Sequence, residues 1–114
     1  MLDVRRILKI DDPLVIDELY LLTETIEDQE LSVDAVVKYM TENLESIGVF
    51  GIFDGDALRG FIYVEPPVPF YPNRGYLYIV AIDPIVPISV SKKLFTLSND
   101  WLMENGATYL WGWT

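Results

Sequence analysis

The sequence predicts an α+β domain in which a mixed, mostly antiparallel central sheet carries helices on both faces. Apolar runs suited to strands alternate with amphipathic helical patterns near both ends of the chain. Two central runs joined by Asp54–Asp56 predict antiparallel pairing, whereas the strand, helix and strand over Tyr76–Trp113 predict one parallel crossover. Because 114 residues suit one hydrophobic core, we expect a single domain over residues 1–114.

The N-terminal part predicts one strand and two helices. The segment Val4–Ile10 suits a short strand. The first helix begins at Asp11–Pro13, because aspartate caps helices and proline is favoured in their first turn, and it ends in the acidic run Glu24–Glu30. Ser32 can cap a second helix, whose buried side is expected to carry Val33, Val36, Val37, Met40 and Leu44.

A hairpin and a proline-rich loop follow. The apolar runs Ile47–Phe53 and Ala57–Val64 flank Asp54–Asp56, and Asp-Gly between two such runs is a strong hairpin signal. The segment Glu65–Pro72 is rich in proline and is therefore expected to be a stiff loop.

The C-terminal part predicts the parallel crossover. Tyr76–Ile82 is a continuous apolar and aromatic run, typical of a strand covered on both faces. Asp83–Ile88 contains two prolines that stop this strand and delay the next helix, which we expect over about Ser89–Asn105. Gly106 is a good left-handed helix stop, and Ala107–Trp113 resumes a strand.

The composition excludes several kinds of chemistry. Cysteine and histidine are absent, so thiolate catalysis, imidazole catalysis and disulfides are excluded, and with only carboxylates as ligands we expect no metal site. A chain without cysteine fits a cytoplasmic protein.

No apolar run reaches the ~18–20 residues that a membrane helix needs, and no signal-peptide pattern opens the chain. We therefore expect no membrane insertion.

The net charge of −10 is unevenly spread, because most acidic residues precede Ser46. Nucleic-acid binding is disfavoured, since that affinity comes from lysine and arginine on phosphates. An acidic face could instead attract a basic protein, a polyamine or an amine substrate. The alternative is a solvated surface that only confers solubility.

Four segments together resemble the GCN5-related N-acetyltransferase superfamily: VRRILKIDDP, FDGDALRGFIYV, YLYIVAIDP and SKKLFTLSNDWLMENGATYLWGWT. The resemblance covers nearly the whole chain and implies an acyl-CoA-dependent N-acetyltransferase. It implies that the pantetheine arm of acetyl-CoA lies between the fourth and fifth strands. The exposed backbone that pairs with this arm would belong to Val80, Ala81 and Ile82.

The resemblance also implies that the cofactor's pyrophosphate binds amide groups at the N-terminus of the last helix. Ser89 and Ser91 fall where the family has glycines, and Lys92 follows them, so these three residues are the expected contacts. The loop departs from the family pattern, because it contains no glycine and Pro87 has no N–H to donate. The alternative is that Ser89 only caps the helix and Lys92 is solvated.

Catalysis in this family needs a base for the amine and an acid for the leaving thiolate. Glu65, just beyond the third strand, is the candidate base, and Tyr109 is the candidate acid. The alternative base is Asp83, and the alternative acids are Tyr76 and Tyr78. Spacing singles out none of them, because tyrosines in strands are usually packing residues and Glu65 enters a loop that is expected to be solvated.

The family normally continues beyond the fifth strand with a short helix and two more strands, whereas this sequence stops at Thr114. The resemblance therefore implies a fold that lacks the last two strands. An exposed edge strand bearing Trp111 and Trp113 is prone to pair, so we expect a homodimer through this C-terminal strand.

Three functional hypotheses result. The first is an acyl-CoA-dependent N-acetyltransferase with an atypical pyrophosphate loop. The second is a catalytically inactive relative that serves as a binding or assembly protein, similar to short relatives in phage genomes, and acts through its acidic face or its C-terminal strand. The third is an acidic inhibitor that imitates nucleic acid toward a basic protein.

Overall fold

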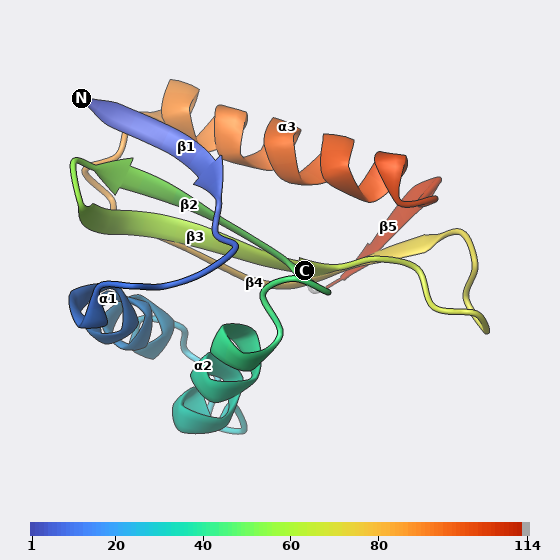
Figure 1. Ribbon diagram of the computed structural model, residues 1–114, viewed down its shortest axis with the longest axis horizontal. Coiled ribbons are helices and arrows are strands. Elements are labelled where there is room, and N and C mark those ends of the chain that lie inside the picture. The colour runs from blue at the N-terminus through green and yellow to red at the C-terminus, as the bar shows by residue number, and fades with distance from the viewer. Residues whose placement is uncertain (113–114) are drawn as a thin grey trace.

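The computed structural model describes residues 1–112 and arranges them as a three-layer α+β domain. Figure 1 shows α1 and α2 on one face of the sheet and α3 on the other, so the predicted fold class is confirmed. The elements in chain order are β1 (Leu2–Arg6), α1 (Pro13–Glu24), α2 (Val33–Glu42), β2 (Gly48–Asp54), β3 (Ala57–Glu65), β4 (Arg74–Ile82), α3 (Ile88–Glu104) and β5 (Tyr109–Gly112). Within residues 1–112, no helix has both the length and the apolar character to cross a membrane.

The strands lie in the order β1-β2-β3-β4-β5. The first three pairings are antiparallel, and only β4 and β5 run parallel, because α3 crosses from the end of one to the start of the other. The predicted meander and crossover are both present. The hairpin turns at Gly55, whose φ of 60° is a conformation that glycine adopts without strain.

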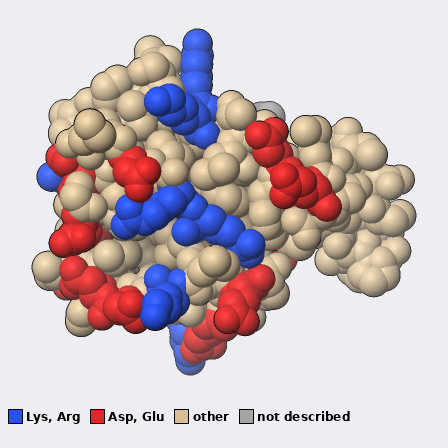
Figure 2. Space-filling model, turned by 45° about the horizontal axis from the view of Figure 1, so that its top comes forward, with Lys and Arg blue, Asp and Glu red and all other residues tan. Residues whose placement is uncertain are grey.

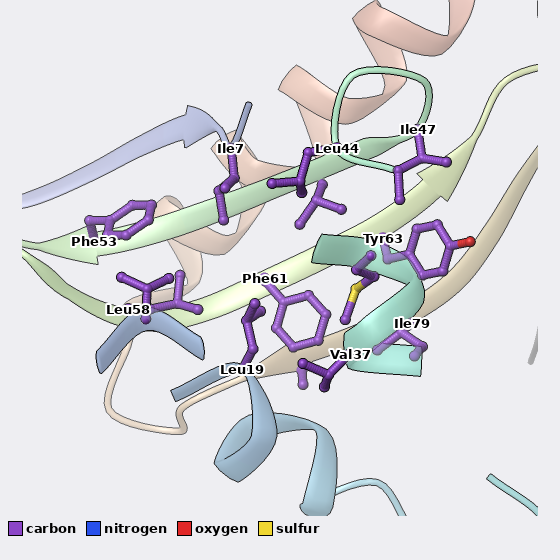
Figure 3. Packing of buried hydrophobic residues seen from close by; sticks show 14 residues of the cluster. Ile7, Leu19, Val37, Leu44, Ile47, Phe53, Leu58, Phe61, Tyr63 and Ile79 are labelled. Carbon is purple, nitrogen blue, oxygen red and sulfur yellow. The ribbon is translucent and has the colours of Figure 1, made fainter. Parts of the chain in front are cut away.

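Two hydrophobic clusters hold the layers together. The one between the sheet and the α1/α2 layer is shown in Figure 3 and comprises Ile7, Val15, Leu19, Val37, Met40, Leu44, Ile47, Val49, Phe53, Leu58, Phe61, Tyr63, Ile79 and Ala81. The cluster under α3 comprises Phe50, Ile52, Ile62, Val64, Val86, Leu94, Leu102 and Ala107. Neighbours in a strand belong to opposite clusters, because strand side chains alternate between faces. The continuous apolar runs in the sequence therefore come from strands that are buried on both sides.

The two N-terminal helices begin where their caps predict. The Asp12 carboxylate accepts a hydrogen bond from the Leu14 N–H at 3.0 Å, and Pro13 is the first helical residue. The Ser32 hydroxyl accepts from the Ala35 N–H at 3.3 Å.

The first strand lies earlier than the sequence predicts, at Leu2–Arg6 rather than Val4–Ile10. Its register is fixed by β2, where Leu2 lies opposite Asp54 and Arg6 opposite Phe50. After Ile7 the chain leaves the sheet edge to reach α1, and the Ile7 side chain turns into the α1/α2 cluster. The apolar residues at the end of the predicted strand therefore pack against the helices instead of continuing the strand.

The prediction that Ser89 caps the last helix is wrong. The helix begins at Ile88, the N-cap residue is Pro87, and no side chain makes a cap hydrogen bond. Pro87 has φ −61° and ψ 145°, so the chain is extended up to this residue and turns helical directly after it. Ser89 is already inside the first turn, where it cannot cap.

The exit of α3 also explains why β5 begins later than predicted. Gly106 has φ +97°, and its N–H bonds the Met103 carbonyl, while the Ala107 N–H bonds the Leu102 carbonyl. This is a Schellman motif, so Ala107 belongs to the end of the helix rather than to the strand. The predicted last strand residue, Trp113, lies outside the described residues.

Candidate functional site

The part of β4 that follows Leu77 has a free edge within the described chain. The β4–β5 ladder runs from the pair Arg74–Tyr109 to the pair Leu77–Gly112. Beyond it, β4 continues to Ile82, and residues 79–82 pair only with β3. A stretch of strand backbone is therefore left without a neighbour on one side.

The direction of this backbone follows from the antiparallel ladder. The Asp83 N–H donates to the Arg59 carbonyl at 2.9 Å, so hydrogen-bonded pairs with β3 fall at Asp83 and, two residues earlier, at Ala81. By the same alternation, the N–H and C=O groups of Val80 and Ile82 point away from β3, toward the free edge. Of the three predicted cofactor-pairing residues, two present their backbone at this edge and Ala81 does not.

A β-bulge lies at the start of the free edge. Tyr63 lies opposite Ile79 and Val64 lies opposite Leu77, so Tyr78 is an extra residue on β4. The ring of Tyr78 stacks on Tyr63, and Ile79 packs in the same α1/α2 cluster as Tyr63. Two consecutive β4 side chains thus face the α1/α2 layer, and the local strand direction changes where the β4–β5 ladder ends.

Two clefts open beside this bulge. The first has a volume of about 410 Å³ and lies between the consecutive β4 residues 76–80 and the segment that joins α1 to α2, including Asp28 and Leu31. The second has a volume of about 540 Å³ and lies between α2 and the sheet, with Tyr39, Tyr63 and Glu65 in its wall.

A tyrosine cluster surrounds Glu65 in the second cleft. The Tyr63 hydroxyl donates a short hydrogen bond to the Glu65 carboxylate. The rings of Tyr63 and Tyr78 are stacked, with centroids 5.0 Å apart and planes 13° apart. Tyr39 approaches Tyr63 to 6.3 Å, and Tyr76 approaches Tyr78 to 4.3 Å. The one carboxylate at the end of β3 is therefore held by a phenol that is itself fixed by packing.

Burial, and after it the hydrogen bond to Glu65, raises the pKa of Tyr63 far above its usual value of 10.0. Burial, and after it the Glu65 charge, also raises the pKa of Tyr78. Both phenols therefore keep their protons at neutral pH, and Tyr63 acts toward Glu65 as a hydrogen-bond donor.

Solved structures of other proteins share this architecture. An aminoglycoside acetyltransferase, meta-AAC0020, from an uncultured soil metagenomic sample matches with a TM-score of 0.71 and 21% identity, over 99% of this chain and 77% of that one. A GCN5-related N-acetyltransferase from Ralstonia eutropha matches with a TM-score of 0.70 and 19% identity, over 100% and 84% of the two chains. The aminoglycoside N-acetyltransferase AAC(6')-Iy in complex with CoA matches with a TM-score of 0.72 and 16% identity, over 100% and 77%.

This protein has the GCN5-related N-acetyltransferase fold. The predicted resemblance is thereby confirmed at the level of the fold, and identities this low show nothing finer. No family model and no curated protein matches the sequence.

In this acetyltransferase fold, the predicted pyrophosphate residues lie at the start of α3. Ser89 and Lys92 are exposed, and Ser91 is half-buried. The N–H groups of Val90 and Ser91 both bond the Pro87 carbonyl, at 3.0 and 3.2 Å. The N–H groups of Ile88 and Ser89 precede any intrahelical acceptor, so they are the ones left for a ligand.

The loop before α3 is partly occupied by its own contacts. The Asp83 carboxylate accepts the Ile85 N–H at 3.1 Å, which removes one donor and places a negative charge in the loop. The Ile88 side chain is 75% exposed at the helix start. This loop of the acetyltransferase fold therefore offers fewer backbone donors than a glycine-rich one would.

The two predicted catalytic residues lie apart. Glu65 is in the wall of the second cleft, whereas Tyr109 begins β5 opposite Arg74, is 52% exposed and lines neither cleft. Tyr76 and Tyr78, which the sequence left as alternatives, line the first cleft. The structure thus brings Glu65 together with Tyr78 in the second cleft, and not with Tyr109.

Sequence analysis missed Tyr39 and Tyr63. Tyr63 had a signal, since it lies two residues before Glu65: the strand, predicted to end at Val64, continues to Glu65, so the two side chains share a face. Tyr39 had none, because its position beside the sheet depends on how α2 packs. Among residues 1–112 no group of three or more Asp and Glu side chains is placed to hold a metal ion.

Proposed function

We propose that this protein is an acyl-CoA-dependent N-acyltransferase that uses acetyl-CoA and an amine acceptor. The observation that carries the proposal is the free edge of β4, where Val80 and Ile82 present unpaired backbone beside a bulge and a cleft. The three solved structures named above are acetyltransferases, and one of these three is a complex with CoA.

The proposed contacts concern the pantetheine arm and the pyrophosphate of acyl-CoA. The outward N–H and C=O groups of Val80 and Ile82 can pair with the amides of a pantetheine arm, as an added strand would. The start of α3 offers the N–H groups of Ile88 and Ser89, the positive end of the helix and the exposed Lys92 to a pyrophosphate. We infer that Ser91 lies too deep in the helix turn to donate its N–H, because that group bonds Pro87.

The cleft residues have distinct roles in this proposal. Acetyl-CoA supplies an activated acyl group when bound. The Glu65 carboxylate accepts the proton that an ammonium acceptor must lose before it can attack, and the Tyr63 hydroxyl holds this carboxylate in place. The Tyr78 hydroxyl holds a proton beside the first cleft, which makes it better placed than Tyr109 for the role of acid.

The test is a calorimetric titration of CoA and acetyl-CoA into the wild-type protein and two variants. Ile88→Glu adds a negative charge at the expected pyrophosphate position, where it also favours the helix, so the fold should be kept. We expect binding by the wild type and about tenfold weaker binding by Ile88→Glu, because like charges repel at this site. Ile88→Gln is the matched neutral control and should bind as the wild type does. Absence of binding at millimolar CoA would refute the proposal.

A second candidate function is that of a catalytically inactive protein that uses the acetyltransferase fold to bind a partner. The glycine-free loop, with the Asp83 carboxylate inside it, favours this alternative. All four residues of β5 are exposed, and Arg74 of β4 lies beside Tyr109 and Trp111. Figure 2 shows no acidic or basic side chain at the right-hand end of the molecule, where Figure 1 places the loop between β3 and β4. The partner would be a second copy that pairs through β5, or a basic protein on the acidic face. Sedimentation distinguishes the two, since only self-pairing gives a concentration-dependent dimer of the isolated protein.

A further inference from the structure

The two clefts beside β4 form one groove. Leu31, Val36 and Tyr78 line both of them, so the clefts adjoin along the side chains of these residues. One end of the groove lies at the segment between α1 and α2, and the other lies at the end of β3. The shared residues form an apolar and aromatic middle.

The groove is acidic at both ends. Asp28 lies in the wall of the first cleft, and Glu30 and Glu65 lie in the wall of the second. Neither wall contains a lysine or an arginine. Arg74 lies outside both walls, where its guanidinium stacks on Tyr71 at 3.5 Å, approaches the ring of Tyr76 to 5.7 Å and lies close enough to act on Tyr78. The walls themselves therefore carry carboxylates and no basic residue, and no ion pair between Arg74 and Asp28, Glu30 or Glu65 is formed within residues 1–112.

Aromatic faces lie between these charges. Tyr39 and Tyr78 are each 46% exposed and flank the buried ring of Tyr63. The face of a tyrosine ring attracts an ammonium group, and the attraction adds to that of a nearby carboxylate. The phenols stay neutral at physiological pH, so they do not weaken this preference by changing charge.

We propose that this groove binds a linear aliphatic diamine or polyamine. One ammonium group lies against Glu65 and the Tyr78 ring, a second lies at Asp28, and the methylene chain covers Leu31 and Val36. A neutral ligand would leave both carboxylates without an opposite charge, and a monoamine would supply one to only one end. The role of this ligand as acyl acceptor rests on the proposed function, but its binding does not.

The test is a calorimetric titration in the absence of CoA with spermidine, 1,4-diaminobutane, 1-aminobutane and 1,4-butanediol. We expect spermidine and the diamine to bind, the monoamine to bind about tenfold more weakly than the diamine, and the diol not to bind. Binding of the diamine should weaken as salt is added. Equal binding of the diamine and the diol, or no binding of either amine at millimolar concentration, would overturn the proposal.

Three variants locate the site. Glu65→Gln and Asp28→Asn should each weaken diamine binding about tenfold, because each removes one charge that pairs with an ammonium group. Asp28→Asn keeps the oxygen that accepts the Glu30 N–H, so the local turn survives. Glu104→Gln removes an equal charge from the exposed end of α3 and should leave binding unchanged. An equal loss in all three variants would show that the net charge, and not the groove, attracts the amine.

This outcome is separate from that of the proposed function. Diamine binding without CoA binding would leave a polyamine-binding protein and refute the transferase. CoA binding without diamine binding would leave the transferase and refute the polyamine groove.

Discussion

Tyr63 and Glu65 show how much of the site depends on single side chains. They lie two residues apart on β3, so they share a face, and the phenol of one holds the carboxylate of the other. The buried ring is packed between Tyr39 and Tyr78, which fixes the phenol before any ligand arrives. In the proposed transferase, where Glu65 is the base, this arrangement would need little reorganisation.

Removing the Tyr63 hydroxyl should change how stability depends on pH. The pKa of this phenol is raised in the folded protein, so above pH 10.0 it ionises in the unfolded chain but not in the native one. The free energy of unfolding contributed by Tyr63 is therefore fully present below pH 10.0 and is lost as the pH rises above it. We expect Tyr63→Phe to cost about 1 kcal/mol at pH 7 and to lose stability less steeply above pH 10.0.

Urea unfolding between pH 7 and pH 11 measures both effects. Tyr109→Phe is the control, because Tyr109 is half exposed and lies outside both clefts. If Tyr63→Phe and wild type lost stability with the same slope above pH 10.0, the burial of the phenol would not matter in this way.

At the scale of the elements, local signals predicted most of the fold. Asp12, Ser32 and Gly106 act where the sequence places them. Of the side chains expected on the buried side of the second helix, Val37, Met40 and Leu44 are buried, and Val33 and Val36 are half-buried. The errors came from contacts between distant residues. The extent of β1 is fixed by its pairing with β2. The start of α3 is fixed by the backbone of Pro87 and not by the side chain of Ser89.

The site was less predictable than the fold for the same reason. The bulge at Tyr78 appears only when β3 and β4 are aligned, and nothing in either segment alone requires it. The grouping of Tyr39, Tyr63 and Glu65 depends on how α2 packs on the sheet. Glu65 was selected by its place after a strand, whereas Tyr109 was selected by residue type alone.

The two serines at helix starts give a direct test of the capping account. Ser32→Ala should destabilise the protein by about 1 kcal/mol, because it removes the acceptor for the Ala35 N–H. Ser89→Ala should change stability by less than about 0.5 kcal/mol, because Ser89 makes no cap hydrogen bond. Thermal unfolding of the two variants measures the difference, and an equal loss would contradict the assignment of Pro87 as the N-cap.

At the scale of the whole molecule, the fold brings together the free edge of β4, the start of α3 and the groove. The crossover through α3 sets β5 beside only the first part of β4, and it brings the helix start back to the end of β4. The α1/α2 layer covers the opposite face and supplies the second wall of the groove. A net charge of −10 fits the proposal of a cationic ligand and opposes the approach of a second copy of the chain.

The central claim is that acyl-CoA pairs with the free edge of β4, and amide hydrogen exchange at single residues tests it most directly. In the free protein, the Ala81 amide should exchange slowly because it bonds β3, whereas the Val80 and Ile82 amides should exchange fast. Saturating CoA should slow exchange at Val80 and Ile82 and leave Ala81 unchanged. Binding of CoA without protection of these two amides would contradict the account.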